Sequence, residues 1–285
     1  MKNDIRLFDY VNIGFYLFMF FIVVINYSKI PNPMPILFMY AAIIASTLFL
    51  IYNENTNRFF RLMRYFYPYF FIGFVFESLG FIVPFINPKN KDYILIHIDR
   101  LILGTDAAKL FNFLNVKGIV DYLQVSYLAY YFLPFFIIYY LYKKKEIKKL
   151  SFTLFALSVG YYISYLGYII LPAIGPRYSL AYLESMPLHG GVIFNFVHPL
   201  LNSLEHIKQD CFPSGHTEIS LLVVMLFWNE NRKIALVLLP VVLSLILATV
   251  VLRYHYLTDV IAGIIVAFLV YYFSKAIFFP KRRHA

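Results

Sequence analysis

The chain has 285 residues, of which 61% are hydrophobic, 14% are charged and only one is a cysteine. A soluble globular domain is about 45–50% apolar and about 25% charged, so this composition excludes that class. The single cysteine excludes an intrachain disulfide and any metal site built from several cysteines.

Apolar segments long enough to cross a bilayer, which takes about 20 helical residues, follow one another along the chain. We predict eight transmembrane helices, the sixth of them short, and hence an all-α polytopic membrane protein. The N-terminus lacks the features of a cleaved leader, so we expect the first span to be retained. The predicted spans are residues 9–28, 35–52, 67–88, 123–142, 151–172, 214–228, 233–252 and 257–279.

Basic residues are unevenly divided between the two sides of these spans. The net charge is +10, and 16 of the 25 Lys and Arg residues fall on one side, which the positive-inside rule makes cytoplasmic, together with both termini. This distribution favours the bilayer as a partner and argues against nucleic acid, with about 1 kcal/mol of attraction to anionic headgroups per basic residue. The 16 are Lys2, Arg6, Arg58, Arg61, Arg64, Lys143, Lys144, Lys145, Lys148, Lys149, Arg232, Lys233, Lys275, Lys281, Arg282 and Arg283.

Between the third and fourth spans, residues 89–122 alternate polar and apolar side chains. This pattern predicts one or two amphipathic helices on the outer interface, broken at Gly104. The segment is either a platform that positions a lipid headgroup or a solvated connector, with Asp99 and Arg100 as a surface ion pair.

The longest outward-facing segment, residues 173–213, carries three histidines and, toward its end, an Asp and a Glu beside them. Its histidines lie nine and eight residues apart, which matches no compact metal-ligand pattern, so we predict no metal. The segment is then either a lid over a site or a loop of ordinary polarity. The five side chains are His189, His198, Glu205, His206 and Asp210.

The run from Cys211 to His216 lies where this loop meets the sixth span. Pro, Ser and Gly at its centre suit the start of a helix, where free N–H groups and the helix dipole attract phosphate. Ser214 and Gly215 are therefore candidate phosphate ligands and His216 is a candidate proton donor; a helix cap beside an interfacial histidine is the alternative. Thr217 stands where a cysteine phosphatase needs arginine, which excludes that chemistry.

A second polar group opens the eighth span. His255 and Asp259 are four residues apart and share one helix face, so the carboxylate can orient the imidazole as a nucleophile or base. Arg253 lies beside them, and Arg177 follows a Gly-Pro break with a guanidinium able to bind two phosphate oxygens. A structural histidine and a snorkelling arginine are the alternatives. Because successive spans reverse direction, Arg177, His216 and His255 are expected on one membrane face.

The chain resembles the type 2 phosphatidic acid phosphatase superfamily in the second and third of that family's three motifs. They are Pro-Ser-Gly-His at 213–216 and Arg-Tyr-His-Tyr-Leu-Thr-Asp-Val-Ile-Ala-Gly at 253–263. The resemblance, which covers residues 171–265, implies a six-helix core that binds a phosphate ester without a metal or other cofactor. We therefore expect an N-terminal transmembrane helix pair at 1–66 and a catalytic membrane domain at 67–285.

The resemblance also implies the role of each motif residue. By matching position, His255 takes the phosphoryl group as phosphohistidine, Asp259 orients it, and His216 protonates the leaving oxygen. Ser214 and the Gly215 amide hold phosphate oxygens. The expected activity is that of a phosphatase or phosphotransferase acting on a phosphorylated lipid at the extracytoplasmic face.

The chain departs from the superfamily pattern at two motifs. Ala248 and Thr249 replace the usual Ser-Arg before the third-motif histidine, and Ile170 replaces a first-motif lysine. Arg177 and Arg253 are candidates to supply the missing positive charge. These variations resemble inositol phosphorylceramide synthases, which transfer a headgroup, whereas the glycine of Pro-Ser-Gly-His is nearer the hydrolases. The missing basic residues also leave open a non-catalytic phospholipid-binding or transport protein.

Overall fold

The computed structural model describes residues 5–204 and 207–280, and every regular element within them is a helix. Six helical segments are long and apolar enough to cross a membrane, or seven if one bent pair is counted as a single span. The protein is therefore an all-α polytopic membrane protein, as predicted. The six are α1 (Leu7–Ile25), α2 (Pro33–Asn53), α3 (Arg58–Leu79) with its continuation α4 (Val83–Ile86), α9 (Ile147–Ile170), α13 (Arg232–Val251) and α14 (Leu257–Phe278).

The bent pair corresponds to the predicted fourth span. It consists of α7 (Lys117–Leu128) and α8 (Leu133–Lys144), joined through the 3₁₀ turn η2 (Ala129–Tyr131) at an angle of 44°. Pro134, in the first turn of α8, has no N–H to donate and so favours a helix start at this point.

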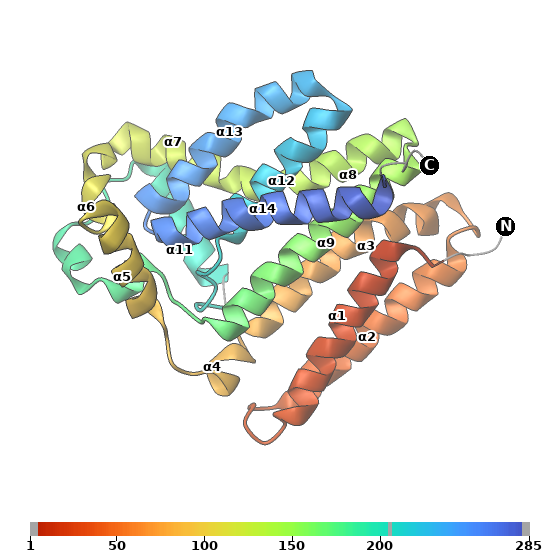
Figure 1. Ribbon diagram of the computed structural model, residues 1–285. Helices are drawn as coiled ribbons and strands as arrows, with labels where there is room; N and C mark the ends of the chain where they lie inside the picture. The colour runs from red at the N-terminus through yellow and green to blue at the C-terminus, as the bar shows by residue number, and fades with distance from the viewer. Residues whose placement is uncertain (1–4, 205–206, 281–285) are drawn as a thin grey trace.

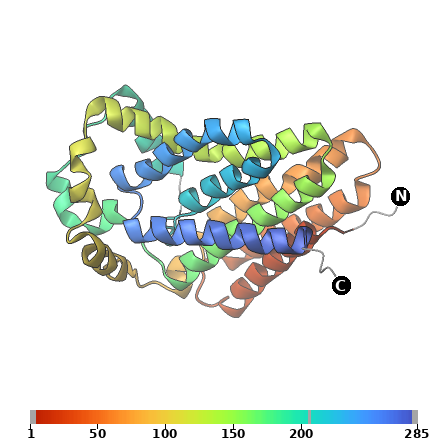
Figure 2. The same cartoon turned by 45° about the horizontal axis from the view of Figure 1, so that its top comes forward.

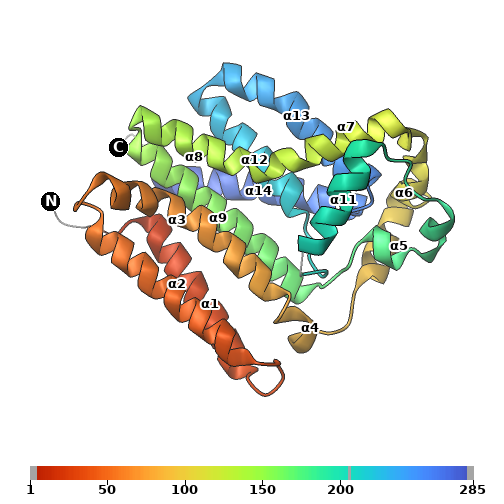
Figure 3. The same ribbon diagram turned by 180° about the vertical axis from the view of Figure 1, so that it is seen from behind.

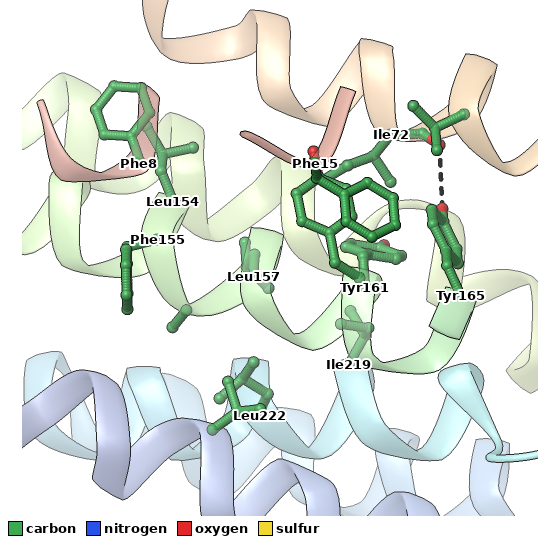
Figure 4. Packing of buried hydrophobic residues seen from close by; sticks show 14 of the residues in the cluster. Phe8, Phe15, Ile72, Leu154, Phe155, Leu157, Tyr161, Tyr165, Ile219 and Leu222 are labelled. Atoms are coloured by element: carbon green, nitrogen blue, oxygen red, sulfur yellow. Dashed lines mark hydrogen bonds between the residues drawn. The ribbon is translucent and has the colours of Figure 1, made fainter. Parts of the chain in front are cut away.

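The predicted sixth span is α12 (Gly215–Glu230), which at 16 residues is shorter than the others. It packs against α8, α9, α13 and α14. Figure 4 shows α9 packed between Phe8 and Phe15 of α1 on one side and Ile219 and Leu222 of α12 on the other. Helix α9 is the most buried span because helices surround it, including α1 and α3 on the side away from α12.

The two ends of the bundle differ. Helix α1 begins and α14 ends at the same end, whereas α5 (Asp92–Leu103), α6 (Ala107–Leu110) and α11 (Val192–Leu204) gather at the opposite end (Figures 1, 2 and 3). Glu205, His206, Lys2, Lys281, Arg282 and Arg283, which entered the sequence-based predictions, lie outside the described residues.

The third span begins nine residues earlier than predicted. The side chain of Asn57 accepts a hydrogen bond from the Phe60 N–H and so caps α3 at its start. Arg64, expected in a basic loop, is fully buried in α3 and pairs with Asp9 of α1 at 2.6 Å. A buried guanidinium is tolerated only with such partners, and this pair fixes the N-terminal helices against α3.

The segment after α4, which we predicted to face outward, is helical and breaks where predicted, since α5 ends at Leu103 and is capped by Gly104 with φ of +72°. The expected ion pair between Asp99 and Arg100 is wrong. Neighbouring residues on a helix point in different directions, so Arg100 pairs with Asp106 at 2.6 Å, whereas Asp99 is buried against the start of α14.

Candidate active site

The start of α12 combines a helix cap with a glycine that a larger residue could not replace. Ser214 is fully buried, and its Oγ accepts the Thr217 N–H at 3.3 Å. A Cβ atom at Gly215 would lie 2.8 Å from the Tyr168 hydroxyl, so close approach requires glycine here. The helix cap and the candidate phosphate cradle are therefore one structure.

His216 and His255 lie close together although they come from different parts of the chain. His216 lies in the first turn of α12, and its Nδ1 is 3.5 Å from Nε2 of His255. His255 lies in the turn between α13 and α14, where its N–H and that of Tyr254 both donate to the Thr249 carbonyl at 2.9 Å. The position where the superfamily has arginine thus supplies the backbone acceptor that holds the third-motif histidine.

The other nitrogen of His255 is held by Cys211. Nδ1 of His255 lies 2.8 Å from the Cys211 carbonyl oxygen, which can only accept, so Nδ1 carries the proton and Nε2 keeps its lone pair. Asp259 is farther away, with Oδ2 at 3.6 Å from Nδ1. That oxygen accepts the Tyr256 N–H and the Cys211 thiol, each at 2.8 Å. Asp259 therefore acts on His255 chiefly through the segments that hold the ring.

A stack of aromatic rings connects His216 with Arg177. The ring of Tyr127 lies 4.5 Å from that of His216 and 4.4 Å from that of Tyr254, measured between centroids. The Arg177 guanidinium carbon lies 4.7 Å from the centroid of Tyr254, at cation–π distance. Arg177 also donates to Oδ1 of Asn202 at 2.7 Å.

The loop that carries Arg177 is joined to the turn that carries His255. The Arg177 N–H donates to the Arg253 carbonyl at 3.2 Å. Gly175 has φ of +82°, and a Cβ atom there would lie 2.7 Å from the Tyr254 carbonyl oxygen, so both conformation and space demand glycine. Arg253, at 5% exposure, makes no side-chain hydrogen bond or ion pair with another described residue, and burial lowers its pKa.

The sequence profile of the PAP2 superfamily matches residues 94–273, well over half of the chain. The chain belongs to the PAP2 superfamily. Searches of curated proteins and of solved structures found no match. The matched region runs from α5 into α14 and contains every candidate site residue, while α1, α2 and α3 lie outside it.

In this PAP2 protein the two loop histidines that the structure describes, His189 and His198, belong to no metal-ligand group. His189 is held through its backbone N–H by Asn115, and His198 contacts the Tyr254 hydroxyl through Nδ1 at 2.8 Å. Burial and the nearby positive charge of Arg177 lower the pKa of His198 from 6.5 to about 4. His198 is therefore a neutral part of the aromatic wall at pH 7.

One group of described side chains has metal-ligand geometry, with its ligand atoms within 4.8 Å of one another: Cys211, His255 and Asp259. In this PAP2 site these atoms already have hydrogen-bond partners, because the thiol donates to Asp259 and Nδ1 of His255 donates to a carbonyl. A metal would have to displace both protons. The absence of a metal stays a prediction.

Helix α5 has a structural role that the sequence did not reveal. Asp92 accepts hydrogen bonds from the Gly175 N–H at 2.9 Å and the Tyr256 hydroxyl at 2.8 Å. Asp99 accepts the Leu257 and Thr258 N–H groups at the start of α14, at 2.9 and 2.8 Å. Two carboxylates of the amphipathic helix thus hold the loop that carries Arg177 and the start of α14, and α5 is more than a solvated connector.

Sequence reasoning also missed Glu218, which is fully buried in α12 two residues after His216. Its Oε2 accepts a hydrogen bond from the Ser164 hydroxyl of α9. Gly160 of α9 leaves the space that this carboxylate occupies, because a Cβ atom at Gly160 would lie 2.6 Å from Oε1 of Glu218. The sequence signal that could have pointed to Glu218 is a single acidic residue inside an apolar segment.

Proposed function

We propose that this PAP2 superfamily protein is a metal-independent membrane enzyme that cleaves a phosphate ester of a lipid through a phosphohistidine on His255. One observation carries the proposal. The Cys211 carbonyl fixes the proton of His255 on Nδ1, so the lone pair of Nε2 points to the side where His216 lies, 3.5 Å away. A nucleophile and a proton donor in this relationship suit phosphoryl transfer.

The reaction proceeds in two balanced steps. Phosphate oxygens bind at the start of α12, beside Ser214 and Gly215, with Arg177 and Arg253 supplying positive charge. Nε2 of His255 attacks phosphorus, the bond to the alcohol oxygen breaks, and protonated His216 gives that oxygen its proton. Water or an alcohol, deprotonated by His216, then attacks the phosphohistidine, which restores both histidines.

The choice between water and an alcohol as the group that attacks the phosphohistidine decides between a phosphatase and a transferase such as an inositol phosphorylceramide synthase.

The site lies at the end of the bundle where α5, α6 and α11 gather, away from the start of α1 and the end of α14 (Figure 1). The basic residues that follow α8 support a cytoplasmic position for that far end, and hence an extracytoplasmic site.

The test uses the purified full-length protein in detergent with dioleoyl phosphatidate, with and without added ceramide, or with ceramide 1-phosphate, with and without added diacylglycerol. Free phosphate and new phospholipid are measured in the same samples, with EDTA throughout. We expect EDTA-resistant turnover that His255→Ala abolishes while the variant still purifies as a folded membrane protein. Binding of lipid phosphate without either product would overturn the enzyme proposal in favour of a binding or transport protein.

A further inference from the structure

A cavity of about 300 Å³ lies between α3, η2 and α9, and His216 forms part of its wall. Asp210 lies in the same wall, and the remaining lining is mostly aromatic. His255 does not line the cavity, so the space adjoins the proposed proton donor and not the proposed nucleophile. The aromatic lining includes Tyr69, Phe70, Phe76, Tyr130, Tyr161 and Tyr165.

The tyrosines contribute ring surface more than hydroxyl groups. The Tyr165 hydroxyl donates to the Ile72 carbonyl at 3.0 Å, the bond drawn in Figure 4. The Tyr69 hydroxyl donates to the Tyr131 carbonyl at 2.5 Å. Because both hydroxyls are satisfied by backbone oxygens, the faces left toward the cavity suit hydrocarbon.

The cavity reaches the outer surface of α3, which is a membrane-spanning helix. Phe70 is 49% exposed, and Gly73, one turn further along, is also exposed and lines the cavity. A Cβ atom at Gly73 would meet nothing within 4 Å. An exposed face of a spanning helix contacts lipid tails, so this opening faces the bilayer and not water.

We propose that this cavity binds the apolar chain of the leaving alcohol, which enters sideways from the bilayer past Gly73. The inference rests on the proposed function, because the group beside the proton donor is the alcohol that departs. Helix α3 lies outside residues 94–273, so the matched sequence profile does not include this wall of the cavity. The chain would lie among the tyrosine rings while its phosphate lies at the start of α12.

Occupancy is tested without turnover by using His255→Ala protein and phosphatidate that carries a diazirine at the end of one acyl chain. After irradiation, we expect labelled peptides from α3 and α9, suppressed by excess unlabelled dioleoyl phosphatidate. Labelling confined to α1, α2 or α13 would overturn the inference. Because the labelling does not require turnover of the substrate, its result tests the cavity even if the proposed activity is absent.

A matched pair of substitutions tests the opening in the active protein. Gly73→Leu fills the mouth of the cavity, and Gly14→Leu places the same side chain at an equally open glycine on α1. Leucine favours helix over glycine, so neither change should prevent folding. We expect Gly73→Leu to lower the ratio of the turnover rate with dioleoyl phosphatidate to the rate with glycerol 3-phosphate about tenfold. This is the effect expected when the acyl chain loses the burial of two methylene groups.

Gly14→Leu should leave that ratio unchanged, and Gly73→Ala should give an intermediate value. An unchanged ratio in Gly73→Leu would overturn the inference while leaving the activity established. Absence of turnover of both substrates by the wild-type protein would instead overturn the proposed function, and the labelling experiment would then decide the cavity alone.

Discussion

The carbonyl oxygen of Cys211 lies 2.8 Å from Nδ1 of His255, nearer than Oδ2 of Asp259 at 3.6 Å. Cys211, two residues before the Pro-Ser-Gly-His motif, therefore holds the histidine of the motif at 253–263. The same cysteine donates its thiol proton to Asp259, so one residue contacts both members of the His–Asp pair. The two motifs form a single hydrogen-bonded unit across 44 residues of sequence.

Cys211→Ala should destabilise this unit. It removes a donor from a buried carboxylate whose Oδ1 already has no hydrogen-bond partner among the described residues, at a cost of about 1–3 kcal/mol. We expect a lower melting temperature in detergent and reduced turnover. Cys211→Ser keeps a donor and should recover most of both. Equal losses in the two variants would show that packing, and not the hydrogen bond, accounts for the effect.

His216→Ala should separate proton donation from nucleophilic attack. With phosphatidate, whose alcohol leaves poorly without a proton, we expect turnover to fall about 10²–10⁴-fold. With p-nitrophenyl phosphate, whose leaving group needs no proton, the first step should persist as a burst of one nitrophenol per protein, leaving acid-labile phosphohistidine. A burst abolished together with steady turnover would contradict the assignment of His216 as the proton donor.

Asp99→Ala should weaken the start of α14, because the Leu257 and Thr258 N–H groups lose their acceptor. We expect a loss of about 1–3 kcal/mol in stability and a lower kcat, since His255 directly precedes this helix start. Asn57→Ala removes the cap of α3 at the opposite end of the bundle and is the matched control. Asn57→Ala should lower the free energy of unfolding by about 0.5–2 kcal/mol without changing kcat. If kcat fell equally in the two variants, a local role for Asp99 at the site would be refuted.

His198 should make stability dependent on pH. Burial lowers its pKa from 6.5 to about 4, with Arg177 adding to the shift, so between these values the unfolded chain binds a proton that the folded chain does not. This contribution to stability is complete above pH 6.5 and is lost as the pH falls toward 4. We expect His198→Gln to show a smaller drop in melting temperature between pH 7 and pH 5 than the wild-type protein. Parallel curves would contradict the shift.

The spans were largely predictable because the length of an apolar run limits where a helix can cross the bilayer. The start of α3 was not predictable, because the charge of Arg64 indicated a loop. Its partner Asp9 lies 55 residues earlier in the chain. The bend at η2 had a signal in Pro134, but the pattern alone predicted one straight span.

The meeting of His216 and His255 followed from the reversal of successive spans, which fixes the membrane side on which each helix starts. The supporting contacts could not be read in the same way. Asp92 and Asp99 had the composition of a solvated helix face, and only the folded chain places them against segments 80 or more residues away. The role of the Cys211 carbonyl belongs to the backbone, which the residue type does not reveal.

The bond from Asp99 to the start of α14 also sets an order on biosynthesis. Asp99 leaves the ribosome before five further segments of the bundle (α7–α8, α9, α12, α13 and α14), whereas the N–H groups that donate to it lie at the start of the last one, just after His255. A nascent chain already inserted through α13 therefore has no assembled candidate site. In the proposed mechanism, cleavage of a lipid phosphate cannot begin until the final segment has entered the membrane.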